Sequence, residues 1–138
     1  MMNTRKKGFT LIELVTVVAI VAVLAALAIP AFLDSLRKSR RSDAMNTIMD
    51  IHLAEQRWRA NDTDYGSLTE MGFSDPQVSP DGHYSIALSA VSATGYTITA
   101  TAQAPQDKDY CGNFILTNTA GVITKTTSKG VVDQCWRK

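Results

Sequence analysis

One apolar run near the N-terminus constrains this chain more than any other feature of its sequence. Positions 9–29 are 21 consecutive residues in which Glu13 is the only charged side chain. As an α-helix that rises about 1.5 Å per residue, the run is about 31 Å long, which is the thickness of the hydrocarbon core of a membrane. Because Arg5, Lys6 and Lys7 precede it, the positive-inside rule places the N-terminus in the cytoplasm and the remaining chain outside.

Glu13 separates three interpretations of this run. A removable secretory signal is supported by the small-x-small triplet at 26–28, and a plain membrane anchor is the second interpretation. Neither has a use for a carboxylate in an apolar helix, where an acidic residue costs about 2.5–3.5 kcal/mol near the centre. Third, a cut between Gly8 and Phe9 would create an α-ammonium four residues before Glu13, as its partner within one helix or between neighbouring subunits.

The two cysteines, Cys111 and Cys135, lie in the polar part of the chain, behind this apolar segment. An exported context favours a disulfide over two free thiols, and the bridge would stabilise the fold by roughly 3.5 kcal/mol. Two buried, reduced cysteines are the alternative. We expect no zinc site, because His52 and His83 are isolated and do not form a ligand pair with the cysteines.

Residues 31–60 are predicted to continue the helix in amphipathic form. One half of the helical wheel holds an apolar stripe made by Ala44, Met45, Ile48, Ile51, His52 and Trp58. The other half holds Asp43, Asn46, Asp50 and Arg57. We expect the stripe to rest on a globular head, with His52 as a partly buried packing residue and not a ligand. The four bases after the apolar run are expected to face solvent, lipid headgroups or acidic patches of other subunits; they are Arg37, Lys38, Arg40 and Arg41.

The rest of the chain predicts a loop followed by antiparallel strands. Residues 61–82 are rich in Asp, Gly and Pro, and Ser67–Glu70 within them has the spacing of a capping box, so we expect a single helical turn there. Alternation of apolar and polar residues predicts one hairpin of strands at 83–91 and 95–104 and a second of strands at 114–117 and 122–126. The predicted fold class is therefore α+β: one long helix on a four-stranded antiparallel sheet with one buried and one exposed face.

The motifs argue for a structural role and against catalysis. The sequence has no recognisable Ser/His/Asp set and no Gly-rich phosphate loop, so we predict a protein that is not an enzyme and needs no cofactor or metal. A formal net charge of +1 argues against a strongly basic chain that coats nucleic acid. Residues 111–138 nevertheless carry four bases against Asp133, which leaves a local nucleic-acid patch open at Lys125, Lys129, Arg137 and Lys138.

The start of the apolar run resembles the type IV pilin signature, which is a short basic leader ending in Gly, then Phe, and Glu at the fifth position after the cut. The matching stretch is Lys6-Lys7-Gly8-Phe9-Thr10-Leu11-Ile12-Glu13. The resemblance implies that a prepilin peptidase removes residues 1–8 on the cytoplasmic side and methylates the new amine of Phe9. Residues 9–30 would then be retained as a transmembrane helix and filament core, in which Glu13 pairs with the Phe9 amine to register each subunit.

The same resemblance implies the organisation of the remaining chain. The globular head would span residues 31–138, with the amphipathic helix at 31–60, an αβ loop at 61–82, the sheet at 83–126 and a disulfide-closed region at 111–135. The C-terminal motifs Asp109-Tyr110-Cys111-Gly112 and Cys135-Trp136 look like those of the small PilE-like minor pilins, a group of type IVa prepilins.

We therefore expect a structural subunit of a type IV pilus, as a minor or small major pilin, that serves pilus biogenesis, adhesion or twitching motility. Its partners would be other pilin subunits, the prepilin peptidase and the inner-membrane assembly platform. The chain would be a single-pass inner-membrane protein with a periplasmic head before assembly, and then part of an extracellular pilus of a Gram-negative bacterium. The alternatives are a pseudopilin of a type II secretion system and a DNA-binding competence pilin.

Overall fold

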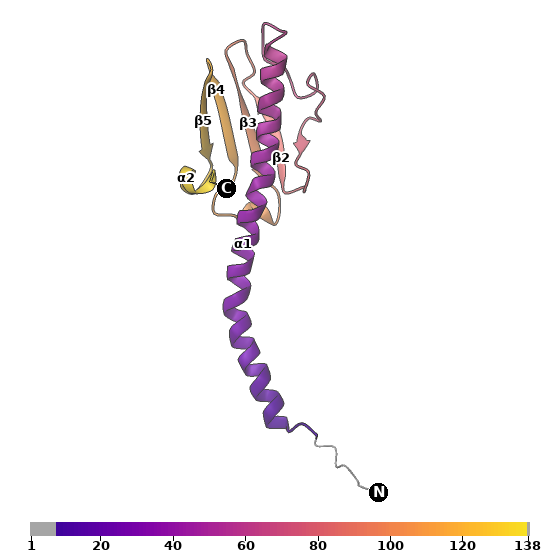
Figure 1. Cartoon of the computed structure of the whole chain (residues 1–138), viewed down its shortest axis with the longest axis vertical. Coiled ribbons are helices and arrows are strands. Elements are labelled where there is room, and N and C mark those ends of the chain that lie inside the picture. Colours follow the sequence, from indigo (N-terminus) through magenta and orange to yellow (C-terminus); the bar gives the residue numbers. More distant parts are fainter. Residues whose placement is uncertain (1–7, 138) are drawn as a thin grey trace. The chain divides into compact units, whose positions relative to one another are not determined.

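The computed structural model describes residues 8–137 (Figure 1). The elements follow in the order α1 (Leu11–Arg59), β1 (Gln77–Val78), β2 (Tyr84–Ser89), β3 (Gly95–Ala102), the 3-10 helix η1 (Gln106–Lys108), β4 (Phe114–Thr119), β5 (Val122–Thr127) and α2 (Val132–Cys135). The chain divides into two compact units, one that ends at Ser35 and one that begins at Leu36. Helix α1 contributes to both units.

The first unit consists mainly of the apolar part of α1. The helix begins after Thr10, whose Oγ1 accepts the backbone N–H of Glu13 at 3.3 Å, and Pro30 lies inside it. Its most apolar 18-residue window has a mean hydropathy of 2.8 and contains no buried residue. Within residues 8–137, α1 is the one helix that is long and apolar enough to cross a membrane.

The second unit contains a five-stranded antiparallel sheet in the order β1-β2-β3-β4-β5. The four predicted strands are present, but β1 is a fifth and lies in the segment that was predicted to be a loop. It has only two residues and pairs with the first half of β2. Pro76 and Pro80 stand on either side of it, and because proline has no backbone N–H, they limit its length.

Both predicted hairpins are confirmed. β2 pairs with β3, and β4 pairs with β5, each over six residue pairs. Ala120 and Gly121 close the second hairpin with positive φ angles of 51° and 86°, which is the backbone twist of a type I′ turn. Asn118 supports this turn because its Oδ1 accepts the N–H of Gly121 at 3.0 Å.

The core of the second unit lies between the amphipathic part of α1 and one face of the sheet. The stripe is buried at Ala44, Met45, Ile48 and Ile51, as predicted, and His52 is half-buried beside it. The sheet contributes the buried side chains Tyr84, Ile86, Tyr96, Ile98, Phe114 and Leu116. In Figure 1 this part of α1 passes over the middle of the sheet, while β5 lies to one side. Residues 122–126 of β5 are all exposed, so the predicted burial of one sheet face does not extend to this strand.

Three charged residues of α1 are buried, and for two of them, Arg41 and Asp43, this contradicts the sequence prediction. Arg41 was expected among the exposed bases, and Asp43 was expected on the polar half, but they are 7% and 6% exposed. The hydroxyl of Ser79 donates to Asp43 Oδ2 at 2.5 Å, and the backbone N–H groups of Asp81 and His83 lie 3.3 and 3.4 Å from its carboxylate oxygens. Asp43 can be buried because its carboxylate accepts hydrogen bonds from donors in the turn that leads into β2.

Candidate functional site

The N-terminal part of the candidate site is exposed. Gly8 and Phe9 precede α1 without regular secondary structure, and Phe9 is 84% exposed. Glu13 lies in the first turn of α1 and is exposed as well. The peptide bond between Gly8 and Phe9 is therefore accessible. The rest of the expected leader, residues 1–7, lies outside the described residues.

Thr10 sets the start of α1 close to the expected cut. Its hydroxyl accepts the N–H of Glu13, and the spacing Thr-x-x-Glu is that of a capping box. A cut after Gly8 would retain this cap and leave Phe9 as the one residue before it. The new ammonium would then lie about one helical turn from Glu13.

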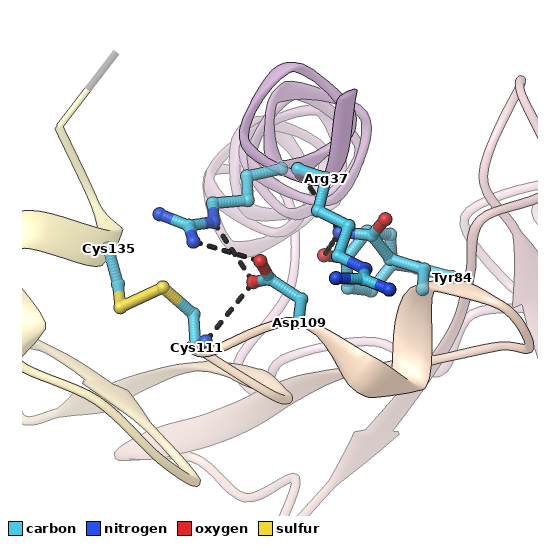
Figure 2. Close-up of polar contacts among 7 residues, drawn as sticks. Arg37, Tyr84, Asp109, Cys111 and Cys135 are labelled. Atoms are coloured by element: carbon cyan, nitrogen blue, oxygen red, sulfur yellow. Dashed lines mark hydrogen bonds and ion pairs between the residues drawn. A yellow bond between two sulfur atoms is a disulfide. The ribbon is translucent and has the colours of Figure 1, made fainter. Parts of the chain in front are cut away.

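The C-terminal segment is tied to α1 through Asp109 (Figure 2). Arg41 Nε donates to Asp109 Oδ2 at 2.9 Å, and its Nη2 donates to Oδ1 at 2.8 Å. Asp109 Oδ2 also accepts the backbone N–H of Cys111 at 3.1 Å. Cys111 forms the expected disulfide with Cys135, and both cysteines are fully buried. One carboxylate thus joins the helix to the disulfide-closed region.

A second set of contacts closes the same corner of the head. The side-chain amide Nε2 of Gln106 donates to the backbone carbonyl of Arg37 at 3.0 Å and to the hydroxyl of Tyr84 at 3.1 Å. Tyr84 and Gln106 are fully buried. Burial raises the pKa of Tyr84 to about 12, so its phenol stays neutral at physiological pH.

Sequence reasoning missed the contact between Arg41 and Asp109, although part of the signal was present. Arg41 lies three residues before Ala44 and seven before Ile48, which places it on the same helical stripe. A base on a buried stripe requires an acidic partner, because an unpaired buried charge is costly. The sequence did not indicate which of the acidic residues supplies it.

The structure brings part of the predicted nucleic-acid patch together around Trp136. The Nζ of Lys125, on β5, lies 5.2 Å from the centroid of the Trp136 ring. The indole Nε1 donates to the carbonyl of Thr126 at 3.0 Å, and the ring packs edge-on against Phe114 with centroids 5.3 Å apart. Arg137 is exposed directly after this ring.

Two further bases were predicted for the same patch. Lys129 is exposed in the turn between β5 and α2, and its backbone N–H donates to the carbonyl of Cys111 at 3.2 Å. This contact places Lys129 beside the disulfide, in the turn that follows β5. Lys138 lies outside the described residues.

His52 contacts β3 through Tyr96. Its Nδ1 is 2.5 Å from the hydroxyl of Tyr96, which also accepts a hydrogen bond from Gln56 Nε2 at 3.3 Å. Burial lowers the pKa of His52, and the ammonium of Lys125 lowers it further. This arrangement fits the predicted packing role. Within residues 8–137, no three His, Cys, Asp or Glu side chains are grouped so that they could hold a metal ion.

Two family models match adjoining parts of the chain. The first, described as "Type IV minor pilin ComP, DNA uptake sequence receptor", matches residues 30–115, which is more than half of the sequence. The second, described as "Prokaryotic N-terminal methylation motif", matches residues 3–29 and includes Gly8, Phe9 and Glu13. A comparison with curated proteins finds no significant match.

Proposed function

This chain belongs to the family of the type IV minor pilin ComP, DNA uptake sequence receptor, and we propose that it joins a pilus through a new N-terminus made by cleavage between Gly8 and Phe9. The protein is a type IV minor pilin, and its family is one of structural subunits. Its apolar helix, together with the N-terminal methylation motif, fits membrane anchoring before assembly. This family membership favours a pilus subunit over a pseudopilin of a type II secretion system.

One observation carries the proposed cleavage and pairing. The first unit presents an apolar helix surface to its surroundings, and Glu13 is the one acidic residue between Gly8 and Ile29. In a filament this surface is buried by neighbouring helices, so the carboxylate needs a cationic partner. The Phe9 ammonium, methylated or not, is a cation and lies at the right distance along the chain. We propose that the two groups pair between neighbouring subunits and set the register of each addition.

The proposed route follows from this pairing. A prepilin peptidase cuts and methylates the chain on the cytoplasmic side of the inner membrane while the head lies in the periplasm. The assembly platform then lifts the helix out of the bilayer. At that step the helix exchanges lipid contacts for contacts with other pilins, and pairing compensates the loss of any water that hydrated the two charges in the membrane interface.

Intact-mass measurement of the protein from sheared pili tests the cleavage. We expect a chain that begins at Phe9 and carries one added methyl group. A product that begins at Ile29 would instead indicate secretory processing after residues 26–28. A full-length chain in pili would contradict both routes.

DNA binding by the head is a second candidate function. The family description favours it, and Lys125 over the Trp136 ring, with Arg137 next to it, combines cations with an aromatic surface. The cations suit the phosphates of a DNA duplex, and the aromatic ring suits the faces of nucleobases where a strand is unpaired. The sequence showed no basic groove interleaved with aromatic residues, but the fold brings Lys125 of β5 to the ring of Trp136, which directly precedes Arg137.

The salt dependence of DNA binding tests this second function. We expect the full chain in detergent to bind a DNA duplex, with affinity falling steeply between about 50 and 200 mM salt. Replacing Lys125 or Arg137 with Gln should lower the slope of log affinity against log salt by about one each. Lys108→Gln, an exposed base in η1, is the matched control. Unchanged slopes in both patch variants would show that DNA binds elsewhere on the chain. No binding by the parent chain at low salt would exclude this function.

A further inference from the structure

A groove of about 440 Å³ opens between the last turns of α1 and the turn at residues 67–72. It lies in the second unit and is separate from the patch at Lys125 and Trp136. Its apolar lining consists of Ala54, Trp58 and Met71. Charged and amide side chains at its rim come from both walls. A volume in this range accommodates a small organic ligand or one unit of a larger one.

The Trp58 wall of the groove is fixed by its packing. A Cβ atom on Gly66 would lie 3.1 Å from three atoms of the Trp58 indole, so the ring packs directly on the glycine backbone. The N–H of Gly66 in turn donates to Glu55 Oε2 at 3.0 Å, and Glu55 is fully buried. The indole is therefore held in place before any ligand arrives, which lowers the entropic cost of binding.

The opposite wall is fixed by a reciprocal pair. Glu70 Oε2 accepts the backbone N–H of Ser67 at 2.7 Å and its hydroxyl at 2.6 Å. The hydroxyl of Ser67 lies 3.4 Å from the N–H of Glu70, which closes the predicted capping box. The Ser67 contacts hold the pKa of the Glu70 carboxyl below its usual value, so it stays ionised. The polar rim is thus as well ordered as the indole.

Several hydrogen-bonding groups of the groove are unused among the described residues. The guanidinium of Arg57, the indole N–H of Trp58, the Oδ1 of Asn61 and the Oε1 of Glu70 make no hydrogen bond there. Two of these groups donate and two accept. A ligand that satisfies them must therefore carry both donors and acceptors along one edge.

The charges of the groove narrow the chemical class of the ligand. Arg57 is opposed by Asp62 and Glu70, which leaves a net charge of −1 and disfavours a polyanion such as DNA. The ligand also needs an apolar face for the Trp58 ring. We propose that the groove binds a neutral sugar ring of a surface glycan, which presents C–H groups to Trp58 and hydroxyls to Arg57 and Glu70. Hydroxyls both donate and accept, so they match the unused groups on the rim.

The test uses the full chain in a polyoxyethylene detergent, because alkyl glycosides would compete for the groove. Immobilised neutral oligosaccharides ending in glucose, galactose, mannose or N-acetylhexosamine are the probes. The chain has two tryptophans, so titration with the best probe can be followed by the separate indole N–H signals of Trp58 and Trp136. We expect the Trp58 signal to move and the Trp136 signal to stay in place. Binding should change little between about 50 and 200 mM salt, unlike that of DNA.

Matched variants decide the assignment. Trp58→Ala should weaken binding at least about tenfold, whereas Trp58→Phe keeps an aromatic ring and should stay within about threefold of the parent. Arg57→Ala changes an exposed side chain and should weaken binding without altering thermal unfolding. This variant therefore tests the groove even if Trp58→Ala disturbs the turn at Gly66. The proposal is overturned if no neutral glycan binds, if binding moves the Trp136 signal alone, or if Arg57→Ala binds as tightly as the parent.

Discussion

The guanidinium of Arg41 contacts both oxygens of the Asp109 carboxylate, through Nε at 2.9 Å and Nη2 at 2.8 Å. The side chains are 9% and 2% exposed, so water screens this ion pair little. Asp109 precedes Cys111 by two residues and also accepts its N–H. The contact therefore fixes where the disulfide-closed region meets the helix, over a sequence separation of 68 residues.

Loss of one member of this pair should destabilise the head strongly. Arg41→Ala leaves the Asp109 carboxylate buried without its cation, and we expect the free energy of unfolding to fall by about 3–5 kcal/mol. Urea unfolding of the full chain in detergent, followed by tryptophan fluorescence, measures it. Arg57→Ala is the matched control, because it removes an exposed arginine from the same helix. Arg41→Met combined with Asp109→Leu should recover most of the loss. A single variant as stable as the parent would show that the pair contributes nothing.

The disulfide should stabilise the head independently of this pair. Mass mapping without reduction should link Cys111 to Cys135, and Cys135→Ser should lower the free energy of unfolding by about 2–4 kcal/mol. Reduction of the parent chain should produce a similar loss and leave the variant unchanged. If the Cys135→Ser chain unfolds at the same urea concentration as the parent, other contacts hold the C-terminal segment.

Glu13 should be required for assembly but not for processing. In Glu13→Val the Phe9 ammonium has no partner, so we expect the amount in sheared pili to fall at least about tenfold relative to the membrane fraction. Cleavage after Gly8 should be unaffected, and quantitative immunoblotting reads both on one gel. Glu13→Asp keeps the carboxylate and should assemble better than Glu13→Val. Normal incorporation of the cleaved Glu13→Val chain would exclude the pairing for this subunit.

The head should lose stability in mild acid because of His52. Its pKa is lowered from 6.5 in the folded state by burial and by Lys125, so the folded state binds this proton more weakly than the unfolded state. The contribution of His52 to the free energy of unfolding is complete above about pH 6.5. It decreases as the pH falls from there to the pKa of His52 in the folded state. The ring contacts the hydroxyl of Tyr96, which Gln56 also contacts, and Lys125 is the charged group that acts on the ring.

Thermal unfolding between pH 8 and pH 5 measures this effect. The parent should lose more stability than His52→Gln across this interval, since the glutamine does not titrate. Glu55 does not produce this trend, because burial raises its pKa and acid therefore favours its folded state. Equal slopes for the two chains would show that His52 does not contribute.

The regular elements of the fold were predictable because each has a simple period. The apolar run predicts the first part of α1 by its unbroken length, and the stripe at Ala44, Ile48 and Ile51, which repeats every three to four residues, predicts the second part. In the strands at 84–89 and 95–102 apolar and polar residues alternate, apart from Ala87. Strand β1, which was not predicted, has two residues and is too short to show a period. Its pairing with β2 is visible only in the structure.

The candidate sites were predictable where a local motif carries them. Gly8, Phe9 and Glu13 follow one another within six residues, so their spacing is readable in sequence. Asp43 and Arg41 were assigned wrongly because their partners, Ser79 and Asp109, lie far along the chain. The groove at Trp58 was missed for a similar reason, since its second wall comes from the turn around Glu70.

Trp136 also affects how readily neighbouring heads aggregate through their sheets. β5 is the last strand of the sheet, so its outer edge has backbone groups available for another strand, and such edges are starting points for aggregation. The indole N–H of Trp136 donates a hydrogen bond to the carbonyl of Thr126 on this strand, so that this carbonyl is not available to another strand. Lys125 places a charge on the same strand, which also opposes pairing. Removal of the last three residues would therefore uncover a strand able to pair with its copy on a neighbouring head. Pilins at high density in a membrane would then aggregate by pairing of their β5 strands before their helices could be extracted.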